Sequence, residues 1–488
     1  MKRFFRWVIT GLMLLIIILI ANTWRLQPKE ESVTHDEIPE ISVVDSLQMV
    51  ERFSRALQIP TISRDKSRRD TAAFRAFFAF LSDRFPGVFS TLQVQWVNRW
   101  SLILHWPGVD AHRKPLLFLA HYDVVPVDSA TLGAWQQPPF SGAIADGFIW
   151  GRGAIDDKAG TLITLEALEI LIRRGFRPQR SIYVAIGHDE EIGGLDGARQ
   201  MARLFQEQGL EFKLVLDEGG TILKDGVAGI TRPVAMVGIA EKGYVTLQLT
   251  ARGTPGHSSM PPRHTAIGKL ARAIQQLESQ PLPAAITGPT RAFFEAIGPY
   301  MPFWPRLIIA NRWLFGPLLI AQLEKQPATN ALVRTTTAVT VIHGGVKSNI
   351  LPAKATALVN FRIRPGESVE QVVVHVRQVI NDPSILIETY GQLAVDPSPV
   401  SAMDGEAFRR VSQSIRRIFP GTLVAPYTVL GATDARHYYR VSQNVYRFLP
   451  LEFQNEDLPR IHGINERIST RNLINGVRFY IDLIQRFD

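Results

Sequence analysis

Three clusters of acidic and histidine side chains follow short apolar runs of the sequence. The runs are typical of buried strands, and each is followed by groups that can bind a metal or transfer a proton. In open α/β sheets ligands bind at the carboxyl ends of the strands, so we expect the three clusters to converge at one edge of a sheet. They are His121 and Asp123 after the run at 116–120, Glu190 and Glu191 after 181–187, and Asp217 and Glu218 after 212–216.

Two further clusters lie outside these runs. Asp156-Asp157-Lys158 follows a glycine-rich turn and opens a predicted helix, and the segment 460–466 carries His462 and Glu466. Each group alone has an ordinary explanation, because a lone histidine is usually a surface group and an aspartate after a strand often caps a helix. Several buried carboxylates at one edge repel one another and are costly to desolvate, so a bound metal best explains the whole set.

The composition limits the ligands and partners. The chain has 488 residues, no cysteine and a formal net charge of +9. Without cysteine there is no disulfide, no thiolate nucleophile and no cysteine-ligated zinc, so any metal must be held by His, Asp and Glu. The basic residues are scattered and no recognition motif is present, so we expect no nucleic-acid partner. The positive charge fits an anionic lipid surface or acidic substrates better.

The elements that would position these groups form two patterns. From about Ser46, strands alternate with helices, which predicts an α/β sheet covered by helices on both faces. From about residue 242 the order is β-α-β-β-α-β, typical of a ferredoxin-like α+β domain inserted into the first one. The sequence therefore predicts a discontinuous first domain at 46–238 and 396–488 and an inserted domain at 239–395.

The N-terminus has the pattern of a membrane anchor. A basic flank precedes an uncharged apolar run from Trp7 to Trp24, and Arg25 closes it. These 18 residues are just enough to span a bilayer as a helix. A cleaved signal peptide is the alternative, but the run offers no good small-x-small cleavage site. We expect a transmembrane anchor at 1–25 and a linker at 26–45, with the N-terminus cytoplasmic and the body on the periplasmic or lumenal side.

Residues 281–334 look foreign to the inserted domain. They are strongly apolar, yet Arg306 and Arg312 interrupt the apolar run, and its charge-free part is too short to span a bilayer. Three explanations remain open for this apolar insertion. It could be simple packing, a contact with the membrane interface, or an apolar wall for a lipophilic substrate.

Taken in order along the chain, these motifs resemble the M20 metallopeptidase family from about residue 46 to the end. Within it, the sequence is most similar to the carboxypeptidase S and N-acyl-amino-acid hydrolase branch, because of Asp157, the segment 431–437, the anchor and the apolar insertion. Many other branches carry Met at the Asp157 position. The matching motifs are His121-x-Asp123, Gly151-Arg-Gly-x-x-Asp156-x-Lys158, Asp189-Glu190-Glu191, Asp217-Glu218-Gly219, Gly253-x-x-Gly256-His257 and His462-Gly-x-Asn-Glu466.

The resemblance implies a zinc-peptidase-like mixed sheet, an inserted lid or dimerisation domain, and two Zn²⁺ ions per chain. Asp123 would fix the tautomer of a ligand histidine, and Glu190 would be the general base. Side chains alternate along a strand, so Glu190 and its neighbour would point opposite ways. Asp217 stays an alternative ligand, since some branches use Asp there, and manganese or cobalt could replace zinc. One zinc would be bound by His121 and Glu218 and the other by Glu191 and His462, with Asp156 bridging them.

Four further residues match family positions that contact the substrate. His257 resembles the histidine that stabilises the oxyanion, which in dimeric members reaches the active site of the other subunit. A homodimer is therefore a further expectation. Asn349, Arg362 and Arg436 match positions that hold the substrate carboxylate or its carbonyl, and an arginine fork suits a terminal carboxylate. The ordinary explanations are a surface turn histidine and solvated arginines.

The sequence thus predicts a membrane-anchored dizinc hydrolase that cleaves an amide bond next to a free C-terminal carboxylate. The first expectation for the substrate is a small peptide, as for a carboxypeptidase. The alternative is an N-acyl amino acid with an apolar, fatty acyl group, which undergoes the same reaction. A non-catalytic, membrane-associated binding protein is a third hypothesis. It is disfavoured because such proteins usually lack a ligand or the base, and here every expected position is filled.

Overall fold

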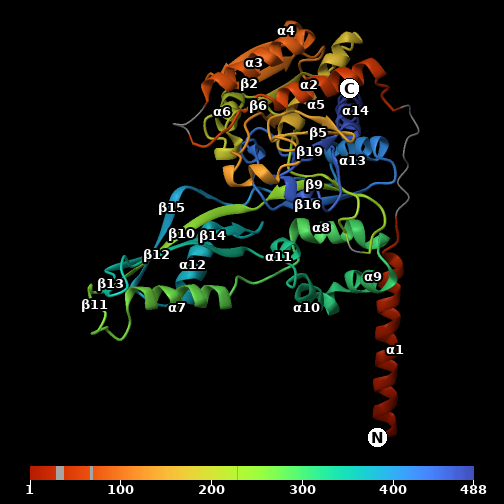
Figure 1. Cartoon of the computed structure of the whole chain (residues 1–488). Coiled ribbons are helices and arrows are strands. Elements are labelled where there is room, and N and C mark those ends of the chain that lie inside the picture. Colours follow the sequence, from red (N-terminus) through yellow and green to blue (C-terminus); the bar gives the residue numbers. More distant parts are fainter. Residues whose placement is uncertain (29–37, 66–69, 228) are drawn as a thin grey trace.

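The computed structural model describes residues 1–28, 38–65, 70–227 and 229–488. A large sheet covered by helices forms the main body, a smaller sheet lies to one side, and a long N-terminal helix leaves the body (Figure 1). Part of the predicted linker, residues 29–37, lies outside the described residues.

The strands lie mostly where the sequence predicts them. In chain order they are β1 (Gln93–Val97), β2 (Ser101–Trp106), β3 (Leu116–His121), β4 (Ile144–Ala145), β5 (Phe148–Trp150), β6 (Ile182–Gly187), β7 (Leu214–Asp217), β8 (Ile222–Leu223), β9 (Val234–Glu241), β10 (Gly243–Arg252), β11 (Gly256–His257), β12 (Thr336–Gly344), β13 (Ile350–Leu351), β14 (Lys354–Ile363), β15 (Ile385–Val395), β16 (Leu423–Val429), β17 (Val445–Arg447), β18 (Glu452–Phe453) and β19 (Arg467–Ser469).

The helices include five short 3₁₀ turns, written η, among the described residues. In chain order the helices are α1 (Lys2–Arg25), α2 (Val43–Leu57), α3 (Thr71–Arg84), α4 (Pro86–Thr91), η1 (Ser129–Ala134), α5 (Lys158–Arg173), η2 (Glu190–Ile192), α6 (Ala198–Glu207), α7 (Ala266–Ser279), α8 (Gly288–Ile297), η3 (Gly298–Tyr300), α9 (Phe303–Ala310), α10 (Arg312–Leu323), α11 (Pro327–Val333), α12 (Val369–Ile380), α13 (Glu406–Ile418), η4 (Asp434–His437), η5 (Leu458–Arg460) and α14 (Thr470–Phe487).

The large sheet is mixed. Within the described residues its strand order is β1-β2-β6-β3-β7-β17-β9-β8-β18, with β16 paired to β9. The central strands β6, β3, β7 and β17 are parallel neighbours, and β1 and β2 are antiparallel at one edge. All six residues of β3 are buried, as expected for a strand covered on both faces. The predicted α/β sheet is confirmed, and the carboxyl ends of its parallel strands meet at one edge.

Helix α5 lies against the centre of this sheet and begins at the functional edge. Asp157 caps its N-terminus, because the Asp157 carboxylate accepts a hydrogen bond from the backbone N–H of Gly160 at 2.9 Å. Its residues from Lys158 to Leu171 are buried. The C-terminal helix α14 packs beside it, and Gly476 permits the close approach, since a Cβ there would lie 2.7 Å from Ile163.

The smaller sheet follows the predicted β-α-β-β-α-β order. Its strands are antiparallel in the order β12-β14-β10-β15, and α7 and α12 pack on it through a separate apolar core. Strand β9 of the large sheet continues to Glu241, inside the range predicted for the inserted domain, because it stays paired with β16 up to Val429. Helix α2 likewise begins at Val43, inside the predicted linker, where the Ser42 side chain caps it.

The apolar insertion at 281–334 forms helices α8 to α11. Helix α8 packs against β9 and β16 of the large sheet, through Phe293, Phe294 and Ile297 against Val234 and Leu423. Part of the insertion is therefore explained by packing. Helices α9 and α10 lie farther out, with α9 beside α1 and α10 packed on α9 (Figure 1). In the described part of the chain, α1 is the one helix long and apolar enough to cross a membrane.

Candidate metal and active site

Asp156 lies between two histidines from distant parts of the chain. One of its carboxylate oxygens, Oδ1, is 3.0 Å from Nε2 of His121, and the other, Oδ2, is 3.0 Å from Nε2 of His462. Glu191 Oε2 lies 3.1 Å from the same nitrogen of His462. Ligand atoms of Asp156, Glu191 and His462 all lie within 4.8 Å of one another. Asp156 therefore presents a separate oxygen to each side, as a bridging carboxylate must.

The surroundings of His121 determine which ring nitrogen is free. Its Nδ1 lies 3.0 Å from the Asp123 carbonyl oxygen and 3.3 Å from Asp123 Oδ1, and both of these oxygens can only accept. The proton of a neutral imidazole is therefore held at Nδ1. The lone pair on Nε2 faces the Asp156 carboxylate and is available to a metal.

Asp123 also positions the two glutamates that follow β6. Its Oδ1 accepts a hydrogen bond from the backbone N–H of Glu190 at 3.2 Å, and its Oδ2 accepts one from Glu191 at 3.3 Å. The Asp123 side chain is fully buried. One carboxylate thus joins the end of β3 to the turn after β6 and fixes three candidate site residues at once.

Glu190 and Glu191 lie in the 3₁₀ turn η2, because β6 ends at Gly187. The prediction that strand alternation separates their side chains is therefore wrong; the turn separates them. Glu190 Oε2 is 3.9 Å from Nε2 of His121, whereas Glu191 contacts His462. Glu191 Oε1 is buried and has no hydrogen-bond partner among the described residues, which leaves it free to bind a cation.

The structure distinguishes Asp217 from Glu218. Both Asp217 oxygens are occupied by backbone N–H groups, from Glu218 at 3.0 Å and from Ala435 at 2.6 Å. Asp217 therefore holds the chain at the end of β7 and is poorly placed to be a ligand. Burial, together with the charges of Asp156 and Asp217, raises the pKa of Glu218 well above its ordinary value.

The electrostatics of the cluster favour a cation. Burial and the charge of Asp156 raise the pKa of Glu191 to about 7. Burial raises the pKa of Glu190 well above its ordinary value, and Asp434 and Glu191 add to this. Hydrogen bonds to Asp156 and Glu191 raise the pKa of His462 to about 10. The groups thus retain protons when no other positive charge is present, and divalent cations held by oxygen and nitrogen donors would replace those protons.

Sequence reasoning gave no role to Glu466, which fixes the Asp156 turn. One Glu466 oxygen accepts from the N–H groups of Ile155 at 2.7 Å and Asp156 at 3.2 Å, and the other accepts from Gly153 and Arg152. Arg152 in turn donates to the carbonyl oxygens of His462 and Gly463. This buried pair therefore connects the Asp156 turn to the segment that carries His462. Both residues lie in the motifs of the resemblance, but nothing in their spacing predicts that they bind each other.

Asp434 is a second residue without a predicted role. It is buried in η4, and a Cβ at Gly187 or Gly194 would lie 2.7 or 2.1 Å from its carboxylate. Burial and the charge of Asp217 raise its pKa well above the ordinary value. Gly187 at the end of β6 and Gly194 after η2 therefore leave room for this carboxyl group.

The predicted substrate-binding residues are spread over the molecule. His257 and Asn349 are exposed on or beside the small β11–β13 ribbon, at the end of the smaller sheet farthest from the cluster (Figure 1). A single chain does not bring them to the carboxylates. Arg362 is on β14, stacked 4.9 Å from the Tyr244 ring, and Arg436 in η4 donates to the Gly193 carbonyl beside η2.

A cavity of about 680 Å³ lies next to the cluster, between η2 and the smaller sheet. Ile192, two residues after Glu190, is part of its wall, and Arg362 is another part. The rest of its wall consists of Leu195, Leu358, Leu393, Tyr244, Tyr390, Thr246, Thr340, Asn360, Gly391, Arg64 and Asp65. The cavity therefore combines an arginine with apolar side chains, and Ile192 connects its wall to the turn that carries Glu190 and Glu191.

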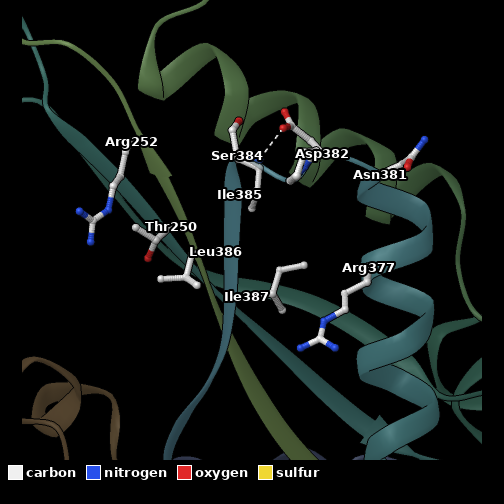
Figure 2. Close-up of a pocket in the computed structure, with 10 residues that line it drawn as sticks. Thr250, Arg252, Arg377, Asn381, Asp382, Ser384, Ile385, Leu386 and Ile387 are labelled. Carbon is white, nitrogen blue, oxygen red and sulfur yellow. Dashed lines mark hydrogen bonds between the residues drawn. The ribbon is translucent and has the colours of Figure 1, made fainter.

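A second cavity, of about 460 Å³, lies on the outer part of the smaller sheet. Figure 2 shows Arg252 and Arg377 on either side of β15 there, and Asp382, which accepts a hydrogen bond from the Ser384 N–H at 2.8 Å. Asp382 is the one carboxylate in its lining. The lining of this cavity therefore lacks a cluster of carboxylates and imidazoles like that of Asp156, Glu191 and His462.

The mixed sheet and the cluster at its functional edge are those of an α/β metallohydrolase. Residues 117–486 match the peptidase family M20/M25/M40, and the chain belongs to this family. The predicted family is confirmed. Metallopeptidases of this family generally use zinc, and the cluster of Asp156, Glu191 and His462 has the donors to bind it.

Curated relatives support the predicted branch. The chain is 41% identical over 486 residues to the N-fatty-acyl-amino acid synthase/hydrolase PM20D1 of Xenopus tropicalis, covering 98% of this chain and 94% of the relative. It is 39% identical over 479 residues to the probable carboxypeptidase S-like 2 of Dictyostelium discoideum, covering 96% and 92%. The chain is a hydrolytic enzyme, as predicted.

Solved structures share the fold at low sequence identity. The M20 family metallo-carboxypeptidase Sso-CP2 of Sulfolobus solfataricus superposes with a TM-score of 0.66 and 19% identity, covering 91% of this chain and 99% of that one. Human carnosine dipeptidase 1 superposes with a TM-score of 0.62 and 16% identity, covering 96% and 99%. These likenesses extend over both sheets.

Proposed function

We propose that this enzyme is a membrane-anchored dizinc amidohydrolase that cleaves the amide bond of an N-acyl amino acid with an apolar acyl group. The observation that carries the two-metal site is the bridging position of Asp156, with one oxygen toward His121 and the other toward His462. One zinc is assigned to His121 and Glu218 and the other to Glu191 and His462. Zinc bound there supplies Lewis acidity for the scissile carbonyl and for water.

The protein side chains supply proton transfer and orientation. Glu190 is assigned as the general base because it is buried beside His121 and makes no contact with His462. A carboxylate with a raised pKa takes a proton from water and returns it to the leaving amine more readily than an ordinary one. Asp123 keeps His121 in the required tautomer and holds Glu190 by its backbone.

The first cavity supports the choice of substrate. Arg362 can receive the substrate carboxylate, with Arg436 near η2, and the leucine and isoleucine side chains can receive an apolar acyl chain. The relative from Xenopus tropicalis is a fatty-acyl-amino acid synthase/hydrolase, which agrees with this choice. The carboxypeptidase S-like relative favours small peptides as the second candidate, which require the same chemistry with a different acyl group.

The wider organisation belongs to the same proposal. Helix α1 would anchor the chain with the N-terminus cytoplasmic and the body on the periplasmic or lumenal side, because the basic flank precedes the apolar run. The discontinuous domain with the large sheet would be catalytic, and the smaller sheet would act as a lid or dimerisation domain. In a homodimer, the exposed His257 of one chain could reach the active site of the other and stabilise the oxyanion.

The test is turnover and metal content of the full-length enzyme in detergent. Long-chain N-acyl amino acids and dipeptides would be compared by kcat/KM, and bound metal would be measured by mass spectrometry. Close to two zinc ions per chain and faster cleavage of the acyl amino acids support the proposal. Faster cleavage of dipeptides would favour the carboxypeptidase, and metal-free protein without turnover would refute both.

A further inference from the structure

Helices α9 and α10 form a hairpin that contacts the C-terminal end of α1, the end nearer the body. Asn311, the residue between the two helices, is fully buried. Its side-chain amide donates to the Leu19 carbonyl at 3.1 Å and to the Thr23 hydroxyl at 3.4 Å, and it accepts from the Asn22 amide at 2.9 Å. Asn22 and Thr23 are polar residues near the end of the apolar run, and this contact explains them.

The position of this contact along the apolar run of α1 follows from helix geometry. The apolar run from Trp7 to Trp24 has 18 residues, which at ~1.5 Å per residue makes ~27 Å and matches the ~30 Å hydrocarbon core of a bilayer. Residues 19–23 lie one to five positions before Trp24, so Asn311 is ~2–8 Å below the end of the run. The hairpin therefore lies at the boundary between acyl chains and headgroups.

The exposed surface of the hairpin has the composition that this boundary requires. Along α10 the exposed positions recur at helical spacing on one face and carry no charge. They include Trp313, 62% exposed, and Leu318, 59% exposed, and on α9 Trp304 is 71% exposed. The complete set on α10 is Trp313, Leu314, Pro317, Leu318, Ala321 and Gln322.

The two arginines of the hairpin do not interrupt this face. Arg312 donates to Glu295 of α8 at 2.7 Å, and Arg306 contacts the Gln27 side chain and the Pro299 carbonyl, both at 3.5 Å. Both guanidinium groups are thus directed to partners in the body or in the segment after α1. Tryptophan is enriched at the membrane–water interface, where its ring lies at the level of the headgroups. Trp304 and Trp313 on the uncharged exposed surface of the hairpin fit this level.

We propose that α9 and α10 are a second membrane contact, which inserts into the interface of the leaflet where α1 ends and holds the catalytic body in one orientation. This rests on the proposed anchoring by α1. Figure 1 shows α9 beside the body-proximal part of α1 and α10 next to α9, while the rest of α1 extends away from the body. The occupant of the apolar face is the bilayer itself, because α1 brings its surface to this level.

The absence of cysteine from the sequence makes a direct test feasible. Full-length enzyme carrying Leu318→Cys, or Trp304→Cys as a second reporter, would be labelled with an environment-sensitive fluorophore and reconstituted into lipid nanodiscs. Nitroxide lipids with the quencher near the headgroup or deep in the acyl chain then report depth. Leu12→Cys, in the middle of α1, tests the anchor. Val109→Cys is the control, because Val109 is 67% exposed and follows β2, a strand on the side of the body away from α1 (Figure 1).

The expected result is loss of emission at Leu318 and Trp304 with the shallow quencher, loss at Leu12 with the deep quencher, and none at Val109. Quenching at Leu12 without quenching at either hairpin position would overturn the second contact and leave the anchor intact. No quenching at Leu12 would refute the anchor. If Leu318 were also not quenched, the hairpin contact would be refuted as well; quenching at Leu318 alone would support a membrane contact of the hairpin without the anchor. Pyrene excimers at Leu318 without lipid quenching would show that a second copy covers the face, which also overturns the proposal.

Discussion

The replacement Glu466→Gln tests whether the buried Arg152–Glu466 pair fixes the metal site. The Glu466 carboxylate accepts four hydrogen bonds, at 2.7 and 3.2 Å on one oxygen and at 2.6 and 3.0 Å on the other. A glutamine has nearly the same shape, but its NH₂ group would face two donors on whichever side it lies. Two hydrogen bonds are lost, two buried donors are left unpaired, and the Arg152 charge loses its counter-ion.

The replacement should lower both the folding stability and the zinc affinity. Breaking a buried ion pair by removing one partner costs about 3–5 kcal/mol of folding free energy. Two of the donors are the backbone N–H groups of Ile155 and Asp156, so a shift of this turn would also move the Asp156 carboxylate. Loss of a group that orients metal ligands typically lowers metal affinity about 10–100-fold, and we expect a decrease of this size in the zinc affinity.

The matched control is Glu166→Gln on α5. Glu166 is also a buried carboxylate paired with an arginine, accepting from Arg52 at 2.6 Å through both oxygens, but it has no contact with the metal ligands. Both variants would be prepared metal-free and titrated with zinc against a chromophoric chelator, with thermal unfolding measured in parallel. We expect both to lose stability and only Glu466→Gln to lose zinc affinity. Wild-type zinc affinity in Glu466→Gln, or an equal loss in Glu166→Gln, would refute the reasoning.

Three further outcomes are expected. Glu190→Gln should keep its zinc, because no assigned ligand is changed, but its kcat should fall about 10²–10⁴-fold, because proton transfer is removed. Near-wild-type turnover with zinc bound would exclude Glu190 as the base. Removing the metals with a chelator should lower the melting temperature and added zinc should restore it, since ligand at 1,000 times its Kd contributes about 4 kcal/mol; an unchanged melting temperature would count against a metal site. Burial and the charge of Arg436 lower the pKa of His437 to about 4, below its unfolded value near 6.5. The unfolded chain therefore binds more protons between these values, and stability should fall as pH drops from about 6.5 to 4. The loss in this window should be smaller in His437→Asn, and an identical pH profile would contradict the assignment.

The candidate site residues could be named from the sequence, because the motifs that carry them are local. Each apolar run that forms a parallel strand is followed by its carboxylates or imidazole, and β6, β3 and β7 are neighbours, so their carboxyl ends must meet. The motif order along the chain was enough to identify the family. The apolar N-terminal helix and the β-α-β-β-α-β order of the smaller sheet were also visible in the periodicity of the side chains.

The partners of the ligands could not be predicted in this way. Asp217 and Glu218 are adjacent carboxylates, and only the N–H groups of Glu218 and Ala435 show that Asp217 is occupied. The separation of Glu190 from Glu191 depends on a 3₁₀ turn that the strand pattern did not indicate. His257 belongs to a matching motif, yet the fold places it at the far end of the smaller sheet (Figure 1).

The sequence by itself determined which side chains are present, near the ends of which strands they fall, and which family they belong to. It could do so because periodicity and motif spacing are local properties of the chain. Only the tertiary structure decided that Glu466 holds the Asp156 turn and that Asn311 fixes the apolar hairpin to α1. These contacts join residues 310 and 292 positions apart, and such pairings arise from the packing of the whole fold, which no local pattern encodes.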